Sequence, residues 1–363
     1  MKKRVVVAMS GGVDSSVAAY ILKQQGYDVI GITLKIWDSD CEKNDVCCGF
    51  SGIEDAKRVS RKIGIKHYVL NAKKIFKEKV ITYFVDEYIN GKTPNPCAYC
   101  NNFIKFDYLL EKSKEISSNF VATGHYANIF FDKHKKRYIL KKGFDEQKDQ
   151  SYFLALLKQK QISSIILPLG NYTKPQVRNI ARNIGLSVAE KPQSQEICFI
   201  QDNDYVNFIK NFKKIKIIPG PIKDLKNISI GIHNGLIAYT IGQRKGLGIS
   251  SKHPLYVKKI IPQENTIYVA EKNFLYQKTI YVNNINPIFW KNFPKNFTCN
   301  VKIRYKNPES PCRCKIIDNN KIKIIMKHSQ WAPTPGQLAV FYRQDVVLGA
   351  GIIEKSEEKY LTS

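Results

Sequence analysis

The 363-residue sequence lacks any uninterrupted apolar run close to the roughly 20 residues that a helix needs to cross a bilayer. Its first ten residues, MKKRVVVAMS, also lack the apolar core of a signal peptide. Internal repeats and low-complexity linkers are absent as well. We therefore expect a cytoplasmic protein with no membrane segment.

Acidic residues are scarce, with 31 Asp and Glu against 58 Lys and Arg, which gives a formal net charge of +27. Arginine is scarce too, since only ten of the 58 basic residues are Arg. The abundance of Lys, Asn and Ile is typical of AT-rich genomes, so the charge alone proves little. Residues 201–363 nevertheless carry 26 basic and 11 acidic side chains. An excess of that size attracts polyanions and predicts a nucleic-acid partner.

With 43% hydrophobic and 11% aromatic residues, the chain can form packed cores, which excludes disorder as its main state. Its length predicts two or three domains. The nine cysteines are odd in number and scattered along the chain, unlike a secreted disulfide scaffold. They are expected to serve packing, metal binding or catalysis.

The first half of the sequence alternates predicted strands and helices. Strands are predicted over residues 3–9, 28–35, 67–70 and 120–123, and helices over residues 13–26, 53–63, 72–90 and 103–116. This alternation predicts an α/β fold with a doubly wound parallel sheet. The pattern of residues 149–200 predicts mostly helices.

From about residue 204 the pattern changes to short alternating segments, which predict an all-β end. The predicted strands cover residues 228–232, 236–241, 255–261, 266–270, 299–305, 321–326 and 338–342.

The most specific local motif is SGGVDSS at residues 10–16, between the first strand and the first helix. Such a turn directs several backbone N–H groups and the positive helix end at one anion. It lacks the Gly-Lys-Ser/Thr end of a Walker loop. The motif instead matches the pyrophosphatase-type loop (PP-loop) of ATP enzymes that cleave between the α and β phosphates, in which an acid such as Asp14 helps to hold Mg²⁺. The alternative is a plain strand-to-helix turn.

A second motif, TPNPCAYCN at residues 93–101, predicts a rigid loop carrying a Cys-x-x-Cys pair just before a helix. Cys97 and Cys100 could form half a zinc site, a redox pair, or a nucleophile with a companion thiol. Cys47 and Cys48 could complete a four-thiolate site, although adjacent cysteines lack the usual zinc spacing. Cys198, taken alone, reads as a small core residue.

Together these motifs resemble one family, the tRNA-specific 2-thiouridylases. The resemblance covers nearly the whole chain and rests on the order and spacing of its motifs. They lie at residues 8–16, 93–101, 123–127 (TGHYA), 148–154 (KDQSYFL), 194–199 (SQEICF), 241–248 (IGQRKGLG) and 335–337 (PGQ).

The resemblance implies an ATP-dependent tRNA-uridine 2-sulfurtransferase. Such an enzyme adenylates the C2 oxygen of the wobble uridine and then replaces that oxygen with sulfur from a protein persulfide. Cys198 is the implied persulfide carrier and Cys100 the implied partner nucleophile, and the two are a possible redox disulfide. The implied ATP-binding residues are Ala8, Met9, Ser10, Gly11, Gly12, Val13, Asp14, Ser15, Leu34 and Gly124.

By the same resemblance, Asn95, Pro96 and Cys97 receive the flipped target base. The implied tRNA contacts are His125, Lys148, Asp149, Gln150, Arg304, Tyr305 and Gln337. Plainer readings stay open for some of them: His125 could orient the turn, residues 304–306 could be a solvated strand edge, and Tyr305 could simply pack.

One position departs from the family, because many members carry Asp where this chain has Cys97. That Asp is a candidate acid/base, and a thiol with an ordinary pKa near ~8.5 is a poorer base. An iron–sulfur cluster or zinc held by Cys47, Cys48, Cys97 and Cys100 is therefore conceivable but not favoured over a metal-free thiol site.

The resulting expectation is a monomer of three domains. These are a PP-loop domain with a helical extension (1–205), a β-rich central tRNA-recognition domain (206–254) and a C-terminal β-barrel (255–363). ATP and Mg²⁺ are the expected cofactors. The expected partners are tRNA and a persulfide donor, either a cysteine desulfurase or a sulfur-relay carrier. The rivals are another PP-loop adenylating enzyme and a non-catalytic RNA- or metal-binding protein.

Overall fold

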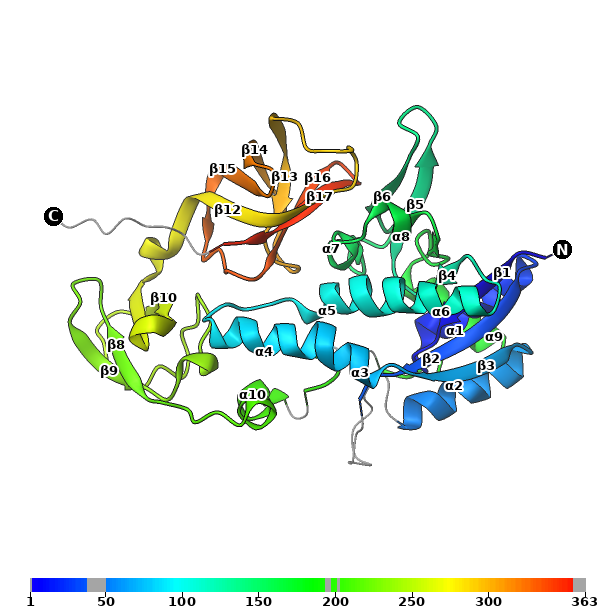
Figure 1. Cartoon of the computed structure of the whole chain (residues 1–363), viewed down its shortest axis with the longest axis horizontal. Coiled ribbons are helices and arrows are strands. Elements are labelled where there is room, and N and C mark those ends of the chain that lie inside the picture. Colours follow the sequence, from blue (N-terminus) through cyan, green and yellow to red (C-terminus); the bar gives the residue numbers. More distant parts are fainter. Residues whose placement is uncertain (1, 38–49, 193–196, 201–202, 355–363) are drawn as a thin grey trace. The chain divides into compact units, whose positions relative to one another are not determined.

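The computed structural model describes residues 2–37, 50–192, 197–200 and 203–354 (Figure 1). The chain divides into two compact units. Unit 1 comprises Met1–Ile81, Pro96–Asn203 and Asp345–Val347, and unit 2 comprises Thr82–Asn95, Asp204–Gln344 and Leu348–Ser363. Within the described ranges, no helix is both long and apolar enough to span a membrane.

A five-stranded parallel sheet lies at the centre of unit 1, with strand order β3-β2-β1-β4-β7. Its strands are β1 (Arg4–Ala8), β2 (Asp28–Lys35), β3 (Lys66–Asn71), β4 (Val121–Ala122) and β7 (Ile165–Ile166). β1 is apolar because both of its faces are covered, and Val5, Val6 and Val7 are fully buried. The predicted doubly wound sheet is confirmed. Its strand order reverses between β1 and β4, where open α/β sheets bind ligands.

Three helices pack around this sheet: α1 (Val13–Gln24), α2 (Phe50–Ile63) and α9 (Lys174–Asn183). Val17 of α1, Val59 of α2 and Val177 of α9 join β1 and β2 in one hydrophobic core. The other helical segments of unit 1 are α3 (Lys73–Phe76), η1 (Lys77–Ile81), α5 (Pro96–Tyr99), η2 (Cys100–Tyr108), α6 (Leu109–Glu115), α7 (Ser151–Leu154) and α8 (Gln159–Ile162).

A β-hairpin also belongs to unit 1, and the sequence pattern did not predict it. It consists of β5 (Ala127–Asp132) and β6 (Arg137–Lys142), which pair antiparallel. Phe130 and Phe131 are exposed, so the period-2 pattern of a half-buried strand is weak here.

Unit 2 contains a four-stranded sheet of order β10-β11-β8-β9 and two helices, α4 (Thr82–Ile89) and α10 (Tyr205–Lys213). Its strands are β8 (Gly220–Lys223), β9 (Ser229–His233), β10 (Leu255–Ile261) and β11 (Thr266–Glu271). The sheet therefore includes strands from both sides of residue 254, where a domain boundary is predicted.

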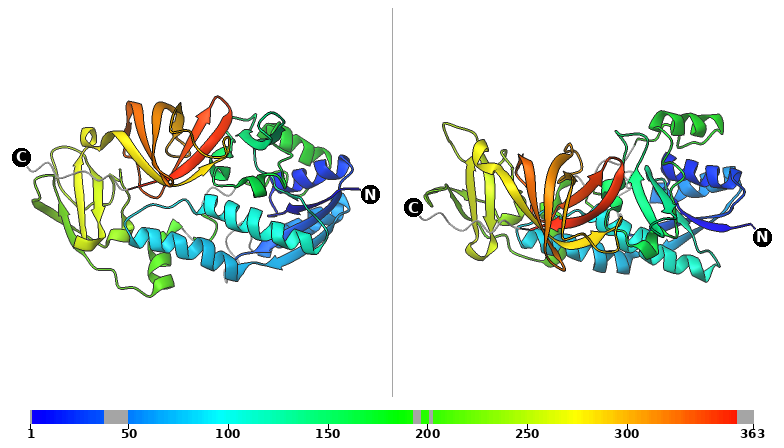
Figure 2. Two further views of the ribbon diagram at one scale, coloured as in Figure 1. Left: turned by 45° about the horizontal axis from the view of Figure 1, so that its top comes forward. Right: turned by 90° about the horizontal axis from the view of Figure 1, so that it is seen from above.

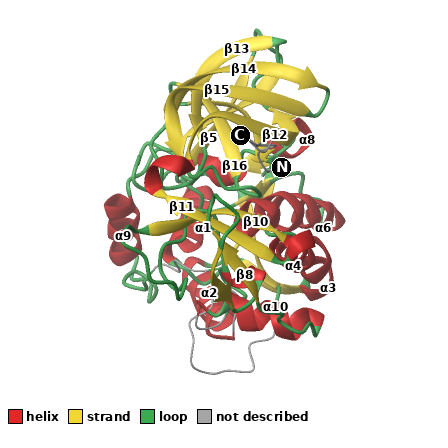
Figure 3. Cartoon of the chain, turned by 90° about the vertical axis from the view of Figure 1, so that its left-hand side faces the viewer, coloured by secondary structure: helices red, strands yellow, loops and turns green. Residues whose placement is uncertain are grey.

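The rest of unit 2 is a barrel of strands, drawn in yellow to red in Figure 2. The strands follow the order β12-β15-β14-β13-β16-β17, and the pairing of β12 with β17 closes the barrel. Its strands are β12 (Tyr276–Pro287), β13 (Asn296–Lys302), β14 (Ser310–Asp318), β15 (Lys321–Trp331), β16 (Leu338–Arg343) and β17 (Val346–Ile353). Figure 3 shows this barrel as a region of strands. The predicted C-terminal β-barrel is confirmed.

Two local predictions for unit 2 are wrong. Residues 236–241 are predicted as a strand, but the chain forms the 3₁₀ helix η4 (Leu236–Ala238) after Gly235, whose φ is +105°. Ile237 and Tyr239 are buried, so this apolar run packs as a buried turn. The alternation of apolar and polar residues alone does not distinguish such a turn from a strand. Helix α10 likewise lies in the part predicted as all-β.

Candidate active site

The loop at residues 10–12 joins β1 to α1 at the point where the sheet order reverses. Gly11 has φ +76°, and a Cβ there would clash with the carbonyl of Gly52, so this position requires glycine. Ser15 Oγ accepts from the Ser10 backbone N–H at 3.2 Å and donates to the Gly12 carbonyl at 3.2 Å. Ser16 Oγ donates to that same carbonyl at 2.8 Å. These bonds fix a loop above the N-terminus of α1, whose first N–H groups are available to an anion.

A pocket opens beside this loop. It is lined by Ala8, Met9, Ser10, Asp14, Ser15, Ile32, Leu34, Lys105, Thr123, Gly124, His125 and Gln150. Seven of these residues are among the predicted ATP-binding residues. Gly124 follows β4, and a Cβ there would lie 2.6 Å from the Asp14 carbonyl carbon. The backbone at Gly124 therefore lies close to the backbone at Asp14, and the absence of a side chain on Gly124 leaves room there for the phosphate chain of a nucleotide.

Asp14 is the centre of a polar network in the first turn of α1. Its Oδ1 accepts from Lys174 Nζ at 2.6 Å and from the Tyr126 hydroxyl at 2.7 Å. Burial lowers the pKa of Lys174, and the carboxylate of Asp14 partly offsets this shift. Burial and the Asp14 charge both raise the pKa of Tyr126, which therefore stays a hydrogen-bond donor.

Lys105, Tyr126 and Lys174 were not predicted as site residues. Lys174 begins α9, which Thr173 caps by accepting from the Gln176 N–H. A cation is unfavourable at a helix N-terminus, so a buried lysine at this position indicates that something other than helix stability keeps it there. The sequence shows a lysine at the start of this helix, but it does not show that Lys174 lies next to Asp14, which is 160 residues away.

Two predicted tRNA contacts, His125 and Gln150, lie in the wall of the same pocket. His125 is buried, its Nδ1 lies 2.7 Å from Thr123 Oγ1, and burial together with the Lys105 charge holds its pKa well below 6.5. Gln150 Oε1 accepts from the Tyr126 N–H at 3.0 Å. The burial and hydrogen bonding of His125 favour the alternative interpretation, in which this residue orients the turn and does not contact tRNA.

The neighbouring Asp149 and Lys148 differ in exposure. Asp149 is buried, and its carboxylate accepts from the N–H of Gly143 and from both the N–H and the hydroxyl of Ser151, at 2.8–3.1 Å. It therefore orders the turn before α7. Lys148 is half-buried.

The Cys-x-x-Cys pair lies within a helix, and not on the loop before one as predicted. Pro96 begins α5, where its fixed φ suits the first helical position. Cys97 is exposed in the first turn, and the half-buried Cys100 begins the π-helical segment η2. The two residues are three apart on a helical run and therefore share a face.

Cys198 is half-buried and belongs to the same unit as Cys100. The ring of the adjacent Phe199 packs against Phe76 of α3 at 5.6 Å, and α3 contacts η2. Cys47, Cys48 and residues 194–196 lie outside the described residues.

The remaining predicted residues are in unit 2. Arg304 Nη2 donates to the carbonyl of Ala332 at 2.7 Å and to Thr334 Oγ1, and its guanidinium lies over Trp331. It therefore holds a turn of the barrel. Tyr305 is half-buried beneath the Lys302 ammonium.

Gln337 contacts the chain just before the predicted base-binding segment. Its Nε2 donates to the carbonyls of Thr93 at 2.8 Å and Pro94 at 3.3 Å. The Thr93 N–H donates to the Pro335 carbonyl at 2.8 Å, and the next residues are the buried Asn95 and Pro96.

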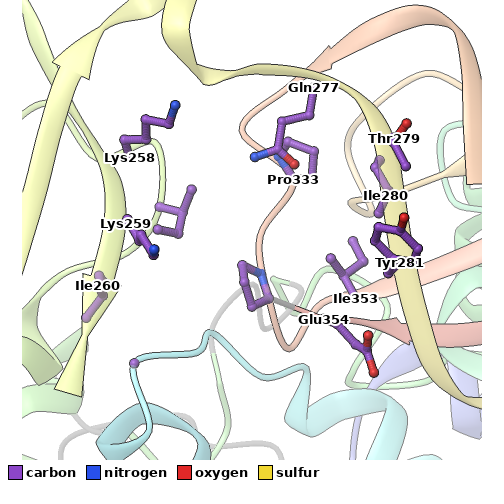
Figure 4. A pocket seen from close by; sticks show the side chains of 13 residues that line it. Lys258, Lys259, Ile260, Gln277, Thr279, Ile280, Tyr281, Pro333, Ile353 and Glu354 are labelled. Atoms are coloured by element: carbon purple, nitrogen blue, oxygen red, sulfur yellow. The ribbon is translucent and has the colours of Figure 1, made fainter. Parts of the chain in front are cut away.

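A second pocket lies wholly in unit 2 (Figure 4). Lys258 and Lys259 of β10 line one side, and Gln277, Thr279 and Tyr281 of β12 line another. It has no glycine-rich loop at a helix N-terminus, so the unit 1 pocket remains the candidate nucleotide site.

Three family models match successive parts of the chain. They are described as tRNA methyl transferase HUP domain (residues 3–202), tRNA methyl transferase PRC-barrel domain (206–271) and Aminomethyltransferase beta-barrel domain (266–353).

Curated relatives match at nearly full length. The tRNA-specific 2-thiouridylase MnmA of Clostridioides difficile (strain 630) is 49% identical over 98% of this chain and 99% of its own. Its namesake from Acetivibrio thermocellus is 47% identical over 97% and 99%. A solved 4-thiouridine synthetase–RNA complex with bound ATP is 16% identical and covers 58% of this chain and 50% of its own, with a TM-score of 0.34, which is too low to bear on function.

Proposed function

The chain belongs to the tRNA-specific 2-thiouridylase family and is a tRNA sulfurtransferase, and from this premise we propose that it adenylates a uridine of tRNA and then thiolates it through Cys198 and Cys100. The observation that carries the proposal is the ion pair that Asp14 of the SGGVDSS motif forms with Lys174, in the unit that also holds both thiols.

In the first step, the uridine O2 attacks the α-phosphorus of ATP, and pyrophosphate leaves. The residues at 8–15, Leu34 and Gly124 bind the nucleotide, and the α1 N–H groups face its phosphates. Lys105 and Lys174 balance phosphate charge. Asp14 is the carboxylate of this pocket and would hold Mg²⁺ together with the phosphates.

In the second step, the terminal sulfur of a Cys198 persulfide attacks C2. The Cys100 thiolate then attacks the Cys198 sulfur, which forms a Cys100–Cys198 disulfide and leaves the transferred sulfur on C2. The C2=S bond forms as AMP departs with the former O2. A persulfide donor protein recharges Cys198 after a dithiol reductant has opened the disulfide. The packing of Phe199 on α3, which contacts η2, supports this pairing.

Asn95, Pro96 and Cys97 would receive the flipped base, since the C2 atom must leave the base stack to be attacked. For tRNA binding we propose Lys148, Tyr305 and the exposed Arg244. Gln337 would instead position the segment before Pro96, and Arg304 a turn of the barrel, because their donor groups bond to neighbouring carbonyls.

Two family models carry the name methyl transferase, which suggests a different group transfer. Two half-buried cysteines in the same unit as a PP-loop serve sulfur transfer, whereas methyl transfer does not require them. Thiolation is therefore the function that the residues favour.

The test is mass analysis of tRNA nucleosides after incubation of the protein with ATP, Mg²⁺ and a persulfide donor. We expect 2-thiouridine in the wild type and none with Cys100→Ser or Cys198→Ser, since a hydroxyl can neither carry nor resolve a persulfide at neutral pH. Both variants should still release pyrophosphate when tRNA is present.

Cys41→Ser is the control for general effects of removing a thiol, since the proposed chemistry does not use Cys41, and it should keep 2-thiouridine formation. Wild-type levels of 2-thiouridine in Cys198→Ser, with free hydrosulfide removed, would exclude the persulfide role. A methylated nucleoside in place of the thiolated one would contradict the proposal as a whole.

A further inference from the structure

Three cysteines of the barrel form a compact cluster that the thiolation chemistry does not use. Cys299 lies on β13, and Cys312 and Cys314 lie on β14. Their sulfur atoms are 3.5 Å (Cys299–Cys312), 3.7 Å (Cys312–Cys314) and 3.9 Å (Cys299–Cys314) apart. Within the described ranges they form a group of potential metal ligands whose atoms all lie within 4.8 Å of one another.

Strand register holds the cluster in place. Cys299 is directly opposite Cys312 in the antiparallel β13–β14 pair, and Cys314 follows two residues later on the same face. Cys312 and Cys314 are buried, whereas Cys299 is half-buried, so Cys299 is the most accessible of the three. Met326 lies opposite Cys312 on β15 and is also buried.

The spacing suits a metal ion. A Zn–S bond of about 2.3 Å at tetrahedral angles separates neighbouring sulfurs by about 3.8 Å. The three observed separations bracket that value, so the thiols form one face of a tetrahedron without any movement of the strands.

We propose that Cys299, Cys312 and Cys314 bind a single thiophilic cation, with Zn²⁺ as the physiological ion. In the complex all three ligands are thiolates, so the protons still held by these cysteines pass to solvent and the complex has net charge −1, with water or a small thiol at the fourth position on the Cys299 side. Arg343 is close enough to Cys299 for their charges to interact, which favours that anionic complex. The ion would cross-link β13 to β14 far along the chain from the nucleotide loop.

The test uses the full-length protein, purified anaerobically without a polyhistidine tag and stripped with a chelator. We expect it to bind one Zn²⁺ per chain and, with Co²⁺ as the probe, to develop the near-ultraviolet absorption of thiolate-to-cobalt charge transfer. Cys312→Ser should lose this band and lower the affinity at least tenfold. The Cys97→Ser/Cys100→Ser double variant is the control and should keep it.

A second measurement on the unaltered chain does not depend on the folding of a variant. Zn²⁺ should protect the half-buried Cys299 from alkylation, mapped by mass spectrometry, while the exposed Cys97 stays reactive. A wild type that binds no metal and shows no protection would overturn the proposal. So would a Co²⁺ band that persists in Cys312→Ser or disappears in the Cys97/Cys100 double variant, since the thiolates would then lie elsewhere.

Discussion

At the scale of single residues, the ion pair of Asp14 and Lys174 is the most informative feature of the site. The two side chains meet at 2.6 Å, each at the start of a helix, and Lys174 is buried there against the helix dipole. A triphosphate beside the loop would compensate that cation, and Asp14 would then be released to bind Mg²⁺. A buried ammonium group whose carboxylate partner can be displaced therefore favours the binding of an anion in this pocket.

We expect Lys174→Met to lower the rate of tRNA-dependent pyrophosphate release about 10²-fold, because one charge that stabilises the transferring phosphoryl group is lost. The Kd for tRNA should change less than about twofold, since the tRNA contacts that we propose do not include Lys174. Pyrophosphate assays and filter binding measure the two quantities. Lys114→Met, on the exposed side of α6, is the matched control and should match the wild type. An equal loss of tRNA affinity in Lys174→Met would assign the lysine to RNA binding.

His125 predicts a pH dependence of stability. Its pKa is held below 6.5 in the folded chain, so below that pH the unfolded chain takes up a proton that the folded chain does not. Stability should therefore be complete above about pH 7 and fall as the pH drops below about 6.5, by at most about 1.4 kcal/mol per pH unit for this residue. His67 and His233, whose pKa values are also lowered by burial, act with the same sign.

The measurement is Tm against pH from 7.5 to 5.5 for the wild type, His125→Gln and the exposed His134→Gln. The slope should be smaller in His125→Gln and unchanged in His134→Gln. Equal slopes in all three would mean that His125 becomes protonated in the folded chain.

At the scale of elements, the π-helical segment η2 distinguishes the region of Cys100. The helical run continues from Pro96 through η2 into α6, and the Leu109 N–H donates to the Ile104 carbonyl, five residues back. π-Helical turns are rare and concentrate at functional sites. Lys105 of this segment lines the candidate nucleotide pocket, so one element carries both the Cys100 thiol and a cation of that pocket.

The segment before Pro96 depends on a contact with the barrel, through Gln337 and the turn at Gly336. We expect Gln337→Ala to lower kcat for thiolation about tenfold and to leave the Kd for tRNA within about twofold, because two hydrogen bonds that fix Thr93 and Pro94 are lost. Single-turnover thiolation and filter binding separate the two effects.

The exposed Gln263→Ala, in the 3₁₀ helix η5 (Pro262–Glu264), is the matched control and should behave as the wild type. A tenfold weaker Kd for tRNA in Gln337→Ala, with an unchanged single-turnover rate, would instead assign Gln337 to direct tRNA contact.

At the scale of the whole molecule, the net charge of +27 predicts a salt-dependent complex with tRNA. Affinity should fall about 10³-fold or more between about 50 and 200 mM salt, because each phosphate contact releases counterions. Arg244→Ala should flatten the plot of log Kd against log salt by roughly one contact. Arg304→Ala should leave the slope unchanged and lower Tm, since its guanidinium bonds to the barrel. A salt-insensitive complex would mean that the charge reflects composition alone.

The sequence by itself determined the features that depend on neighbouring residues. Strand β2 was predicted to the residue, and the SGGVDSS motif forms the turn after β1 and the first turn of α1, because a buried strand, a glycine turn and a helix start are set by local periodicity and backbone freedom. Motif order was sufficient to identify the family. Leu236–Ala238 was mispredicted because the packing of an apolar run, and not its alternation, decides between strand and turn.

Only the tertiary structure decided which distant residues meet. Lys174 reaches Asp14 because α9 packs on α1 at the same end of the sheet, and no spacing in the sequence encodes that contact. Cys299 meets Cys312 and Cys314 because of the β13–β14 register, where a shift of one residue would turn Cys299 to the other face. Local order follows from chain neighbours, whereas the charges and thiols of a site depend on how the elements pack.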